Sequence, residues 1–190
     1  MKLLTKAYVL ANKKQIIEDM ISGKIFIYPT DTIYGIGCNA LNEEAVAKIR
    51  SIKKRDNKPF SIVVPSFEWI HQNCIATQAG KIWIGKLPGP YTLILPLKNQ
   101  NAVAKSVILS SPSIGIRIPN NWFYELIKEI NIPFVTTSAN ISGKYYMTDF
   151  YNLDENIKQE VDYIIYEGAL EKKPSMVVKL SDNKEEILKR

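Results

Sequence analysis

Short apolar runs of strand type alternate with amphipathic stretches of helix type, and this alternation constrains the fold more than any other feature. The runs IFIYP, SIVVP, YTLILPL, IGIRIP and FVTTSAN are bounded by turn residues, as is typical of buried strands. Between them, apolar residues recur at helical spacing. Strands that alternate with helices favour an α/β fold. We therefore predict a twisted, mixed β-sheet with flanking helices.

Residues that cap helices mark where these helices are expected to begin. Five such residues precede amphipathic stretches: Asn12, Asn42, Ser66, Thr77 and Asn121. The helix after Asn42 covers NEEAVAKIRSIKK, with acidic residues first and basic residues last, as the helix dipole favours. Near the C-terminus we expect a short helix around residues 149–156 and strands in VDYIIYEG, SMVVKL and EEILKR.

Length and charge restrict the class of protein. The 190 residues suit one domain over residues 1–190. The net charge of +6 favours polyanionic partners such as nucleotides, RNA, DNA or acidic lipid. No apolar stretch approaches the roughly 20 residues of a membrane span, so we expect no membrane partner. Cys38 and Cys74 lack the spacing of a metal or redox motif, which favours free thiols in a reducing cytoplasm.

Several kinds of catalytic site are excluded. The single histidine, His71, has no partner histidine or cysteine pair for a metal site or a triad. The segment GKIWIGKL resembles a P-loop, but Leu87 replaces the magnesium-binding hydroxyl and Ile82, Trp83 and Ile84 form a helical face. No GxGxxG fingerprint occurs. We predict no metal site built from protein ligands.

Polar clusters lie where strands end, which is where open α/β sheets bind ligands. They are YPTDTIYGIG, Arg117 within SIGIRIP, and TTSANISG; the basic run KKRDNKPF lies instead between a helix and the start of a strand. Each has a plain structural alternative. Lys53 and Lys54 can complement a helix dipole, Thr30 to Thr32 can form a turn, and Ser138 with Asn140 can form a cap or Asx turn. Arg117 needs a carboxylate or phosphate partner unless it points outward from an edge strand.

Five motifs in order resemble the successive motifs of the YrdC family, in its short, single-domain form. They are YPTDTIYGIGCNAL, the K-x-R-x-x-K-P run from Lys53 to Pro59, LPGPYTLIL, IGIRIP and TTSANISG, and the resemblance covers about residues 12–180. It implies a YrdC-like fold with a central basic cleft. It also implies an L-threonylcarbamoyladenylate synthase, a nucleotidyltransferase that joins L-threonine, bicarbonate and ATP into threonylcarbamoyl-AMP and pyrophosphate.

The resemblance extends to partners. A separate tRNA threonylcarbamoyl transferase would pass the product to adenosine 37 of tRNAs that read ANN codons. Mg²⁺ would accompany ATP, and tRNA or double-stranded RNA is a candidate partner of the basic cleft.

The same resemblance assigns roles to residues. Lys53 and Arg55 would be catalytic and, with Lys58, would face the triphosphate. The residues that would bind threonine are Thr30, Tyr34, Arg117 and Thr137. Of these, Arg117 would contact the carboxylate of the threonine substrate. The remaining nucleotide contacts would be Ser113, Ser138, Asn140 and Ser175.

The chain departs from the family pattern after SGK, where it reads YYMTDF. The contacts of the loop 142–150 therefore cannot be assigned, although Thr148 is one candidate. Two alternatives to the synthase remain open at this stage. One is a related enzyme that makes carbamoyl-adenylate for another acceptor. The other is a non-catalytic RNA-binding protein, whose phosphate contacts would be spread over a surface.

Overall fold

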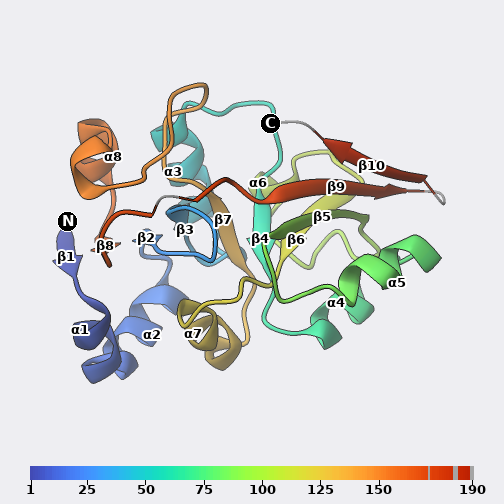
Figure 1. Cartoon of the computed structure of the whole chain (residues 1–190), viewed down its shortest axis with the longest axis horizontal. Helices are drawn as coiled ribbons and strands as arrows, with labels where there is room; N and C mark the ends of the chain where they lie inside the picture. The colour runs from blue at the N-terminus through green and yellow to red at the C-terminus, as the bar shows by residue number, and fades with distance from the viewer. Residues whose placement is uncertain (171, 182–183, 189–190) are drawn as a thin grey trace.

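A ten-stranded, open and twisted β-sheet runs through the computed structural model, which describes residues 1–170, 172–181 and 184–188 (Figure 1). The strand order is β1-β8-β2-β3-β7-β4-β6-β5-β9-β10. Four neighbouring pairs are parallel and five are antiparallel. The predicted mixed sheet is confirmed. Its strands are β1 (Lys2–Leu4), β2 (Phe26–Tyr28), β3 (Gly35–Gly37), β4 (Ser61–Val63), β5 (Tyr91–Pro96), β6 (Ser113–Arg117), β7 (Phe134–Ser138), β8 (Tyr163–Ile165), β9 (Met176–Ser181) and β10 (Lys184–Leu188).

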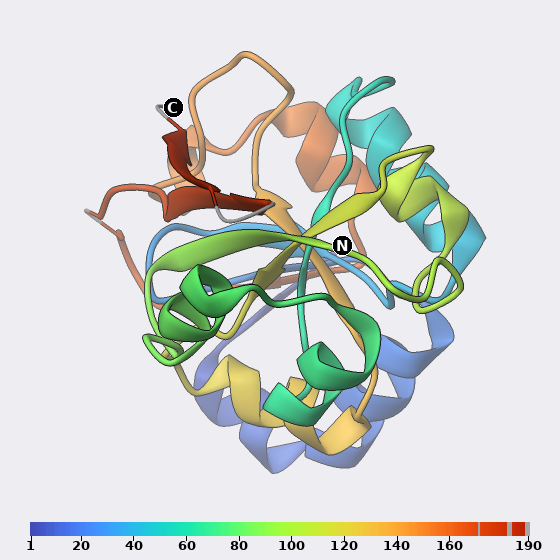
Figure 2. The ribbon, with the colours of Figure 1, turned by 90° about the vertical axis from the view of Figure 1, so that its right-hand side faces the viewer.

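Helices cover the sheet on two sides, as Figure 2 shows. One set comprises α1 (Lys6–Ala11), α2 (Lys13–Ser22) and α7 (Phe123–Ile130). The other helices are α3 (Glu43–Lys53), α4 (Phe67–Asn73), α5 (Gln78–Ile84), α6 (Lys105–Ile108) and α8 (Glu155–Glu160), with a 3-10 turn over Phe150–Asn152.

Alternation along the strands divides the buried apolar residues into two cores. Phe26 and Tyr28 of β2 pack in the core that contains α1, α2 and α7. Ile27, between them, packs in the larger core with Val46 and Ile49 of α3. Strand β2 therefore packs against helices on both of its faces.

Three of the five expected helix caps are confirmed. The side chains of Asn42, Ser66 and Thr77 accept backbone hydrogen bonds from the first turns of α3, α4 and α5. Asn12 occupies the expected N-cap position of α2 but makes no side-chain capping bond, and the expected cap Asn121 is wrong. Asn12 donates its side-chain N–H to the carbonyl of Tyr8 in the preceding helix, and Asn121 donates to the carbonyl of Pro29 instead of capping α7. Helix α5 also includes the GKIWI segment, which confirms its helical interpretation.

Both cysteines, Cys38 and Cys74, are free and buried, as expected. Within the described residues, no helix has the length and apolar character needed to cross a bilayer.

Among the glycines of the described residues, Gly37 of β3 comes closest to a neighbouring backbone. A Cβ at this position would lie 1.9 Å from the carbonyl oxygen of Val135, on neighbouring β7. We expect Gly37→Ala to destabilise the fold by about 1 to 3 kcal/mol, the usual cost of overpacking. Gly80→Ala is the control, because its Cβ would meet ordinary contacts at 3.5 Å and alanine favours helix α5. Equal urea midpoints for the two variants would contradict this assignment.

Candidate functional site

Three pockets lie where the predicted polar clusters come together. The first, which we call the hydroxyl pocket, is small, at about 30 Å³. Eight serine or threonine residues line it together with Tyr34 and Arg117: Thr30, Thr32, Ser61, Thr92, Thr136, Thr137, Ser138 and Ser175. They come from the ends of β2, β6 and β7 and from neighbouring segments. Clusters far apart in sequence thus form one cavity.

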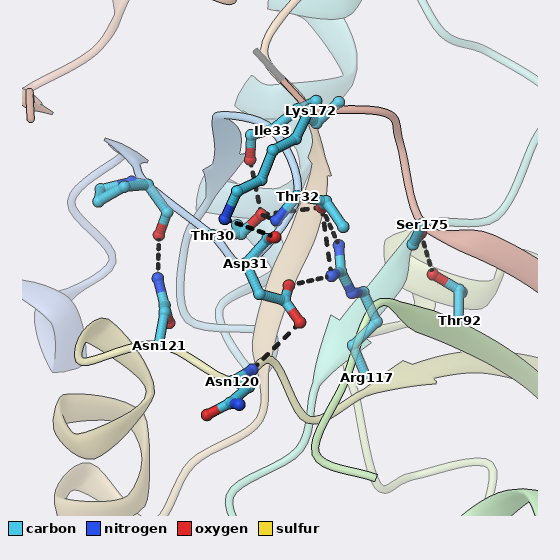
Figure 3. Close-up of polar contacts among 11 residues, drawn as sticks. Thr30, Asp31, Thr32, Ile33, Thr92, Arg117, Asn120, Asn121, Lys172 and Ser175 are labelled. Atoms are coloured by element: carbon cyan, nitrogen blue, oxygen red, sulfur yellow. Dashed lines mark hydrogen bonds and ion pairs between the residues drawn. The ribbon is translucent and has the colours of Figure 1, made fainter. Parts of the chain in front are cut away.

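Arg117 forms a buried ion pair with Asp31 at this pocket. Its Nη2 donates to Asp31 Oδ1 at 2.6 Å, and the two side chains are 8% and 9% exposed. Both terminal nitrogens also lie within 3.4 Å of the Thr32 hydroxyl, and Figure 3 shows the guanidinium directed at these two residues. The outward-facing alternative for Arg117 is wrong. Its Nε is buried without a hydrogen-bond partner among the described residues, which is uncommon for a buried polar atom.

Thr30 and Tyr34 use their hydroxyls within the protein. Thr30 donates to the carbonyl of Ile33 at 2.6 Å and accepts from the N–H of Thr32 at 3.0 Å, so the turn interpretation holds for this residue. Tyr34 donates to the carbonyl of Gly168 at 2.7 Å and accepts from the N–H of Glu167 at 3.0 Å. Burial raises the pKa of Tyr34 to about 12. Tyr34, which lines the hydroxyl pocket, therefore anchors the segment that follows β8.

The second pocket, the cationic pocket, has a volume of about 350 Å³. Its lining combines the basic run with the loop after β7: Lys53, Lys54, Arg55, Lys58, Ser138 and Asn140, with Asp56, Asn57, Ser142 and Gly143. Four cations against one carboxylate in this described lining make it attractive to an anion.

Lys53 lies at the back of this pocket and is 1% exposed. Its Nζ donates to the carbonyls of Ser138 at 2.5 Å and Asn140 at 2.6 Å, and to Asn140 Oδ1 at 3.1 Å. Its own carbonyl accepts from the N–H of Ser142 at 2.9 Å. The three protons of the ammonium thus meet three protein oxygens. In this structure Lys53 fixes the loop after β7; its contact with a phosphate stays a prediction.

Burial, and after it the charge of Arg55, lower the pKa of Lys53 to about 7. Since an unfolded lysine has a pKa near 10.4, the unfolded state binds more protons between about pH 7 and pH 10, and this group makes stability rise with pH there. We therefore expect Lys53→Met to cost more stability at about pH 9 than at about pH 7, by at most about 1.4 kcal/mol per pH unit. Urea unfolding of both proteins measures this, and equal costs at both pH values would show that the three oxygens keep the ammonium charged.

Two arginines shape the turn of residues 55–59. Arg55 donates to the carbonyls of Lys58 at 3.2 Å and Pro59 at 2.6 Å, and its Nη1 lies 3.5 Å from the Thr137 hydroxyl. Arg50 of α3 donates to the carbonyls of Arg55 and Lys58. Sequence reasoning missed Arg50, because in the sequence it is one more cation on a helix.

The third pocket, the apolar pocket, is the largest of the three at about 610 Å³. Tyr146, Pro174, Met176 and Leu188 line it, together with Ser138 and Ser175. Ser175 is 4% exposed and its hydroxyl lies 2.7 Å from that of Thr92. Tyr146 belongs to the loop whose contacts the sequence left open. Thr148, the candidate from that loop, instead accepts from the Asn152 side chain and lines none of the three pockets.

Ser138 lines all three pockets. Its hydroxyl donates to Asn140 Oδ1 at 2.6 Å, and the Asn140 side chain donates to the carbonyl of Lys144. Of the predicted site residues, Ser113 is the one that lines none of these pockets; its N–H and carbonyl bond to the Ser111 side chain. The others are brought together, and Asp31, Thr92 and Arg50 join them.

Comparison with known proteins agrees with this geometry. The family model of Sua5, YciO and YrdC, described as "Telomere recombination", matches residues 18–190. The chain belongs to the Sua5/YciO/YrdC family. The resemblance found in its motifs is therefore confirmed.

Individual relatives in this family carry informative names. A Methanocaldococcus jannaschii protein, provisionally named threonylcarbamoyl-AMP synthase, is 41% identical over 180 residues, which is 90% of this chain and 84% of the relative. The threonylcarbamoyl-AMP synthase of Blochmanniella floridana is 30% identical over 150 residues, 74% of this chain and 76% of the relative.

Among solved structures, Pyrococcus abyssi Sua5 complexed with L-threonine superposes with a TM-score of 0.84 at 27% identity. The match covers 98% of this chain and 56% of that chain. This chain therefore spans little more than half the length of Sua5, and the α/β fold expected from the family is confirmed.

Proposed function

We propose that this chain is a threonylcarbamoyl-AMP synthase, a nucleotidyltransferase that forms threonylcarbamoyl-AMP and pyrophosphate from L-threonine, bicarbonate and ATP. Two relatives that match most of their own length bear this name. The observation that carries the proposal is the meeting of three pockets at Ser138. A reaction that joins an amino acid to a nucleotide needs adjoining sites for both.

The chemistry asks chiefly for charge neutralisation and positioning. Bicarbonate takes up a proton and loses water to give CO₂, and the threonine amine adds to this CO₂ and loses a proton to form a carbamate. A carbamate oxygen attacks the α-phosphorus of ATP in line, and the bond to the β-phosphate bridging oxygen breaks to release pyrophosphate. Arg55 and Lys58 in the cationic pocket would stabilise the charge that develops on the leaving group. This is the role that we propose for the predicted basic cleft.

The amino acid fits the hydroxyl pocket by chemistry, although not by present volume. A space of about 30 Å³ admits little more than water, so threonine binding requires the pocket to widen. Hydroxyl groups of the lining can bond the threonine side chain, and the unpartnered Nε of Arg117 offers a charged donor for its carboxylate. Thr30, Tyr34 and Thr137 would then surround the substrate.

Magnesium would enter with ATP. Mg²⁺ usually binds substrate phosphates and water with one or two carboxylates, and Asp56 is the carboxylate among the described residues of the cationic pocket. The described residues contain no group of three or more histidine, cysteine, aspartate or glutamate side chains suited to a metal. The metal would therefore be held mainly by phosphate oxygens, whose charge it partly neutralises.

The product, a mixed anhydride of a carbamate and AMP, must be consumed by an acyl transferase. We propose that this transferase passes the threonylcarbamoyl group to adenosine 37 of tRNA in the cytoplasm. The structure favours a small-molecule site over a non-catalytic RNA surface, because the cations of the basic run line one pocket with Ser138 and Asn140.

Pyrophosphate release tests the function directly. The protein is incubated with ATP, Mg²⁺, L-threonine and bicarbonate, and each component is then omitted in turn. Release that requires both threonine and bicarbonate supports the synthase. Release without threonine, or salt-sensitive RNA binding with no turnover, would contradict it.

A further inference from the structure

We propose that the apolar pocket binds the adenine ring of ATP and that Tyr146 is the residue on which the ring stacks. This inference rests on the proposed function, which supplies ATP as the ligand. The position of Tyr146 comes from the structure, because its loop departs from the family pattern in sequence.

The position of the adenine base follows from the way the three pockets adjoin at Ser138. Reaction with the carbamate places the α-phosphate of ATP near Ser138, where the hydroxyl pocket opens. From there the two phosphates of the leaving group extend into the cationic pocket, whose charge suits them. The nucleoside must leave Ser138 in another direction. The apolar pocket shares Ser138 with both other pockets and shares Ser175 with the hydroxyl pocket.

The lining of the apolar pocket suits a nucleobase. One aromatic ring, Tyr146, lies among Pro174, Met176 and Leu188, and no charged side chain is among its described lining residues. The two serine hydroxyls supply polar groups at the edge nearest the phosphates. At about 610 Å³ the pocket falls within the usual range for small-molecule sites, roughly 300 to 1,000 Å³. A base and a ribose therefore have room there.

The loop holds Tyr146 in place before any ligand arrives. Met147, the next residue, is fully buried, and its N–H donates to the carbonyl of Ala139 at 3.1 Å. The N–H of Lys144 donates to the carbonyl of Ile141 at 3.0 Å. Tyr146 thus sits between a buried anchor and Tyr145, whose side chain is 98% exposed. Tyr146 is half-buried and lines the apolar pocket, whereas Tyr145 does not line it, so Tyr145 provides a matched control.

Binding measurements distinguish the contribution of the base to ATP affinity from the contribution of the phosphates. Dissociation constants are measured for ATP and for inorganic tripolyphosphate with the unmodified chain, Tyr146→Ala, Tyr146→Phe and Tyr145→Ala. We expect Tyr146→Ala to weaken ATP binding about 10- to 100-fold, since base stacking on an aromatic ring has that effect. Tyr146→Phe, which keeps the ring, restores the affinity, and Tyr145→Ala leaves it unchanged. Tripolyphosphate affinity stays the same in all four proteins.

Two results would overturn the assignment. Equal ATP affinities in Tyr146→Ala and Tyr145→Ala would show that no stacking occurs at Tyr146. A parallel loss of tripolyphosphate affinity in Tyr146→Ala would show that the residue merely supports the loop. Because these measurements need no turnover, their failure is distinct from a failure of the unmodified chain to release pyrophosphate, which would refute the function itself.

Discussion

Replacing Lys53 with methionine is expected to lower the turnover rate by about 100-fold or more. The variant removes the buried donor shared by three oxygens of Ser138 and Asn140. The Ser138 carbonyl and Asn140 Oδ1 keep a second donor, but the Asn140 carbonyl loses its donor among the described residues, and an unsatisfied group costs about 1 to 3 kcal/mol. The loop after β7 would then lose the conformation that places Ser138 where the three pockets meet. A displacement of about 1 Å in an active site is sufficient for a 100-fold loss of rate. The rate is measured as threonine-dependent pyrophosphate release.

Lys54→Met is the matched control for Lys53. Lys54 lines the same cationic pocket, but its side chain is exposed. Below about pH 7, the pKa of Lys53, both variants remove one positive charge, so at such a pH an effect of charge alone would be similar in the two. We expect a small change for Lys54→Met, together with faster amide hydrogen exchange in residues 138–144 for Lys53→Met alone. Equal losses of activity with unchanged exchange would contradict the positioning role.

The second large effect is expected when the pair of Arg117 and Asp31 is broken. Arg117→Met leaves the Asp31 carboxylate buried without its cation, which typically costs about 3 to 5 kcal/mol of stability. We also expect the KM for threonine to rise at least about 10-fold, with a much smaller change in the KM for ATP. Urea unfolding and steady-state kinetics measure the two effects separately.

A double-mutant cycle with Asp31→Asn provides the control for Arg117. If the ion pair carries the stability loss, the double variant loses less than the sum of the single variants, because contacting residues are not additive. The threonine KM of Arg117→Met should remain high even when Asp31→Asn relieves the buried charge. A KM that returns to normal in the double variant would show that Arg117 matters only as the partner of Asp31.

Much of the fold could be predicted because its signals are local. Helix α3 and its cap Asn42 follow from spacing and from a single side-chain hydrogen bond. Strands β1 and β3 and the short helices α1 and α6 were missed. Strand β3 reads only Gly-Ile-Gly and is stabilised by pairing with β2 and β7, of which β7 lies about 100 residues further along the chain. Pairing over such separations leaves little trace in a three-residue segment.

The site was predictable in composition and less so in orientation. The motifs identified nearly every residue that lines the hydroxyl and cationic pockets. They did not reveal that Lys53 points inward, because its acceptors at Ser138 and Asn140 lie more than 80 positions away. Likewise, Arg117 was expected to need an anionic partner, but Asp31 could be identified only once β2 and β6 were placed in the sheet. Tyr146 carried no signal beyond its departure from the family motif.

The most direct test is a crystal structure of the protein with L-threonine and a non-hydrolysable ATP analogue. We expect the triphosphate beside Arg55 and Lys58, the amino acid in a widened hydroxyl pocket, and the α-phosphorus next to Ser138 between them. Density that places the amino acid and the α-phosphate in separate, unconnected cavities would contradict the proposal that Ser138 marks the point of reaction.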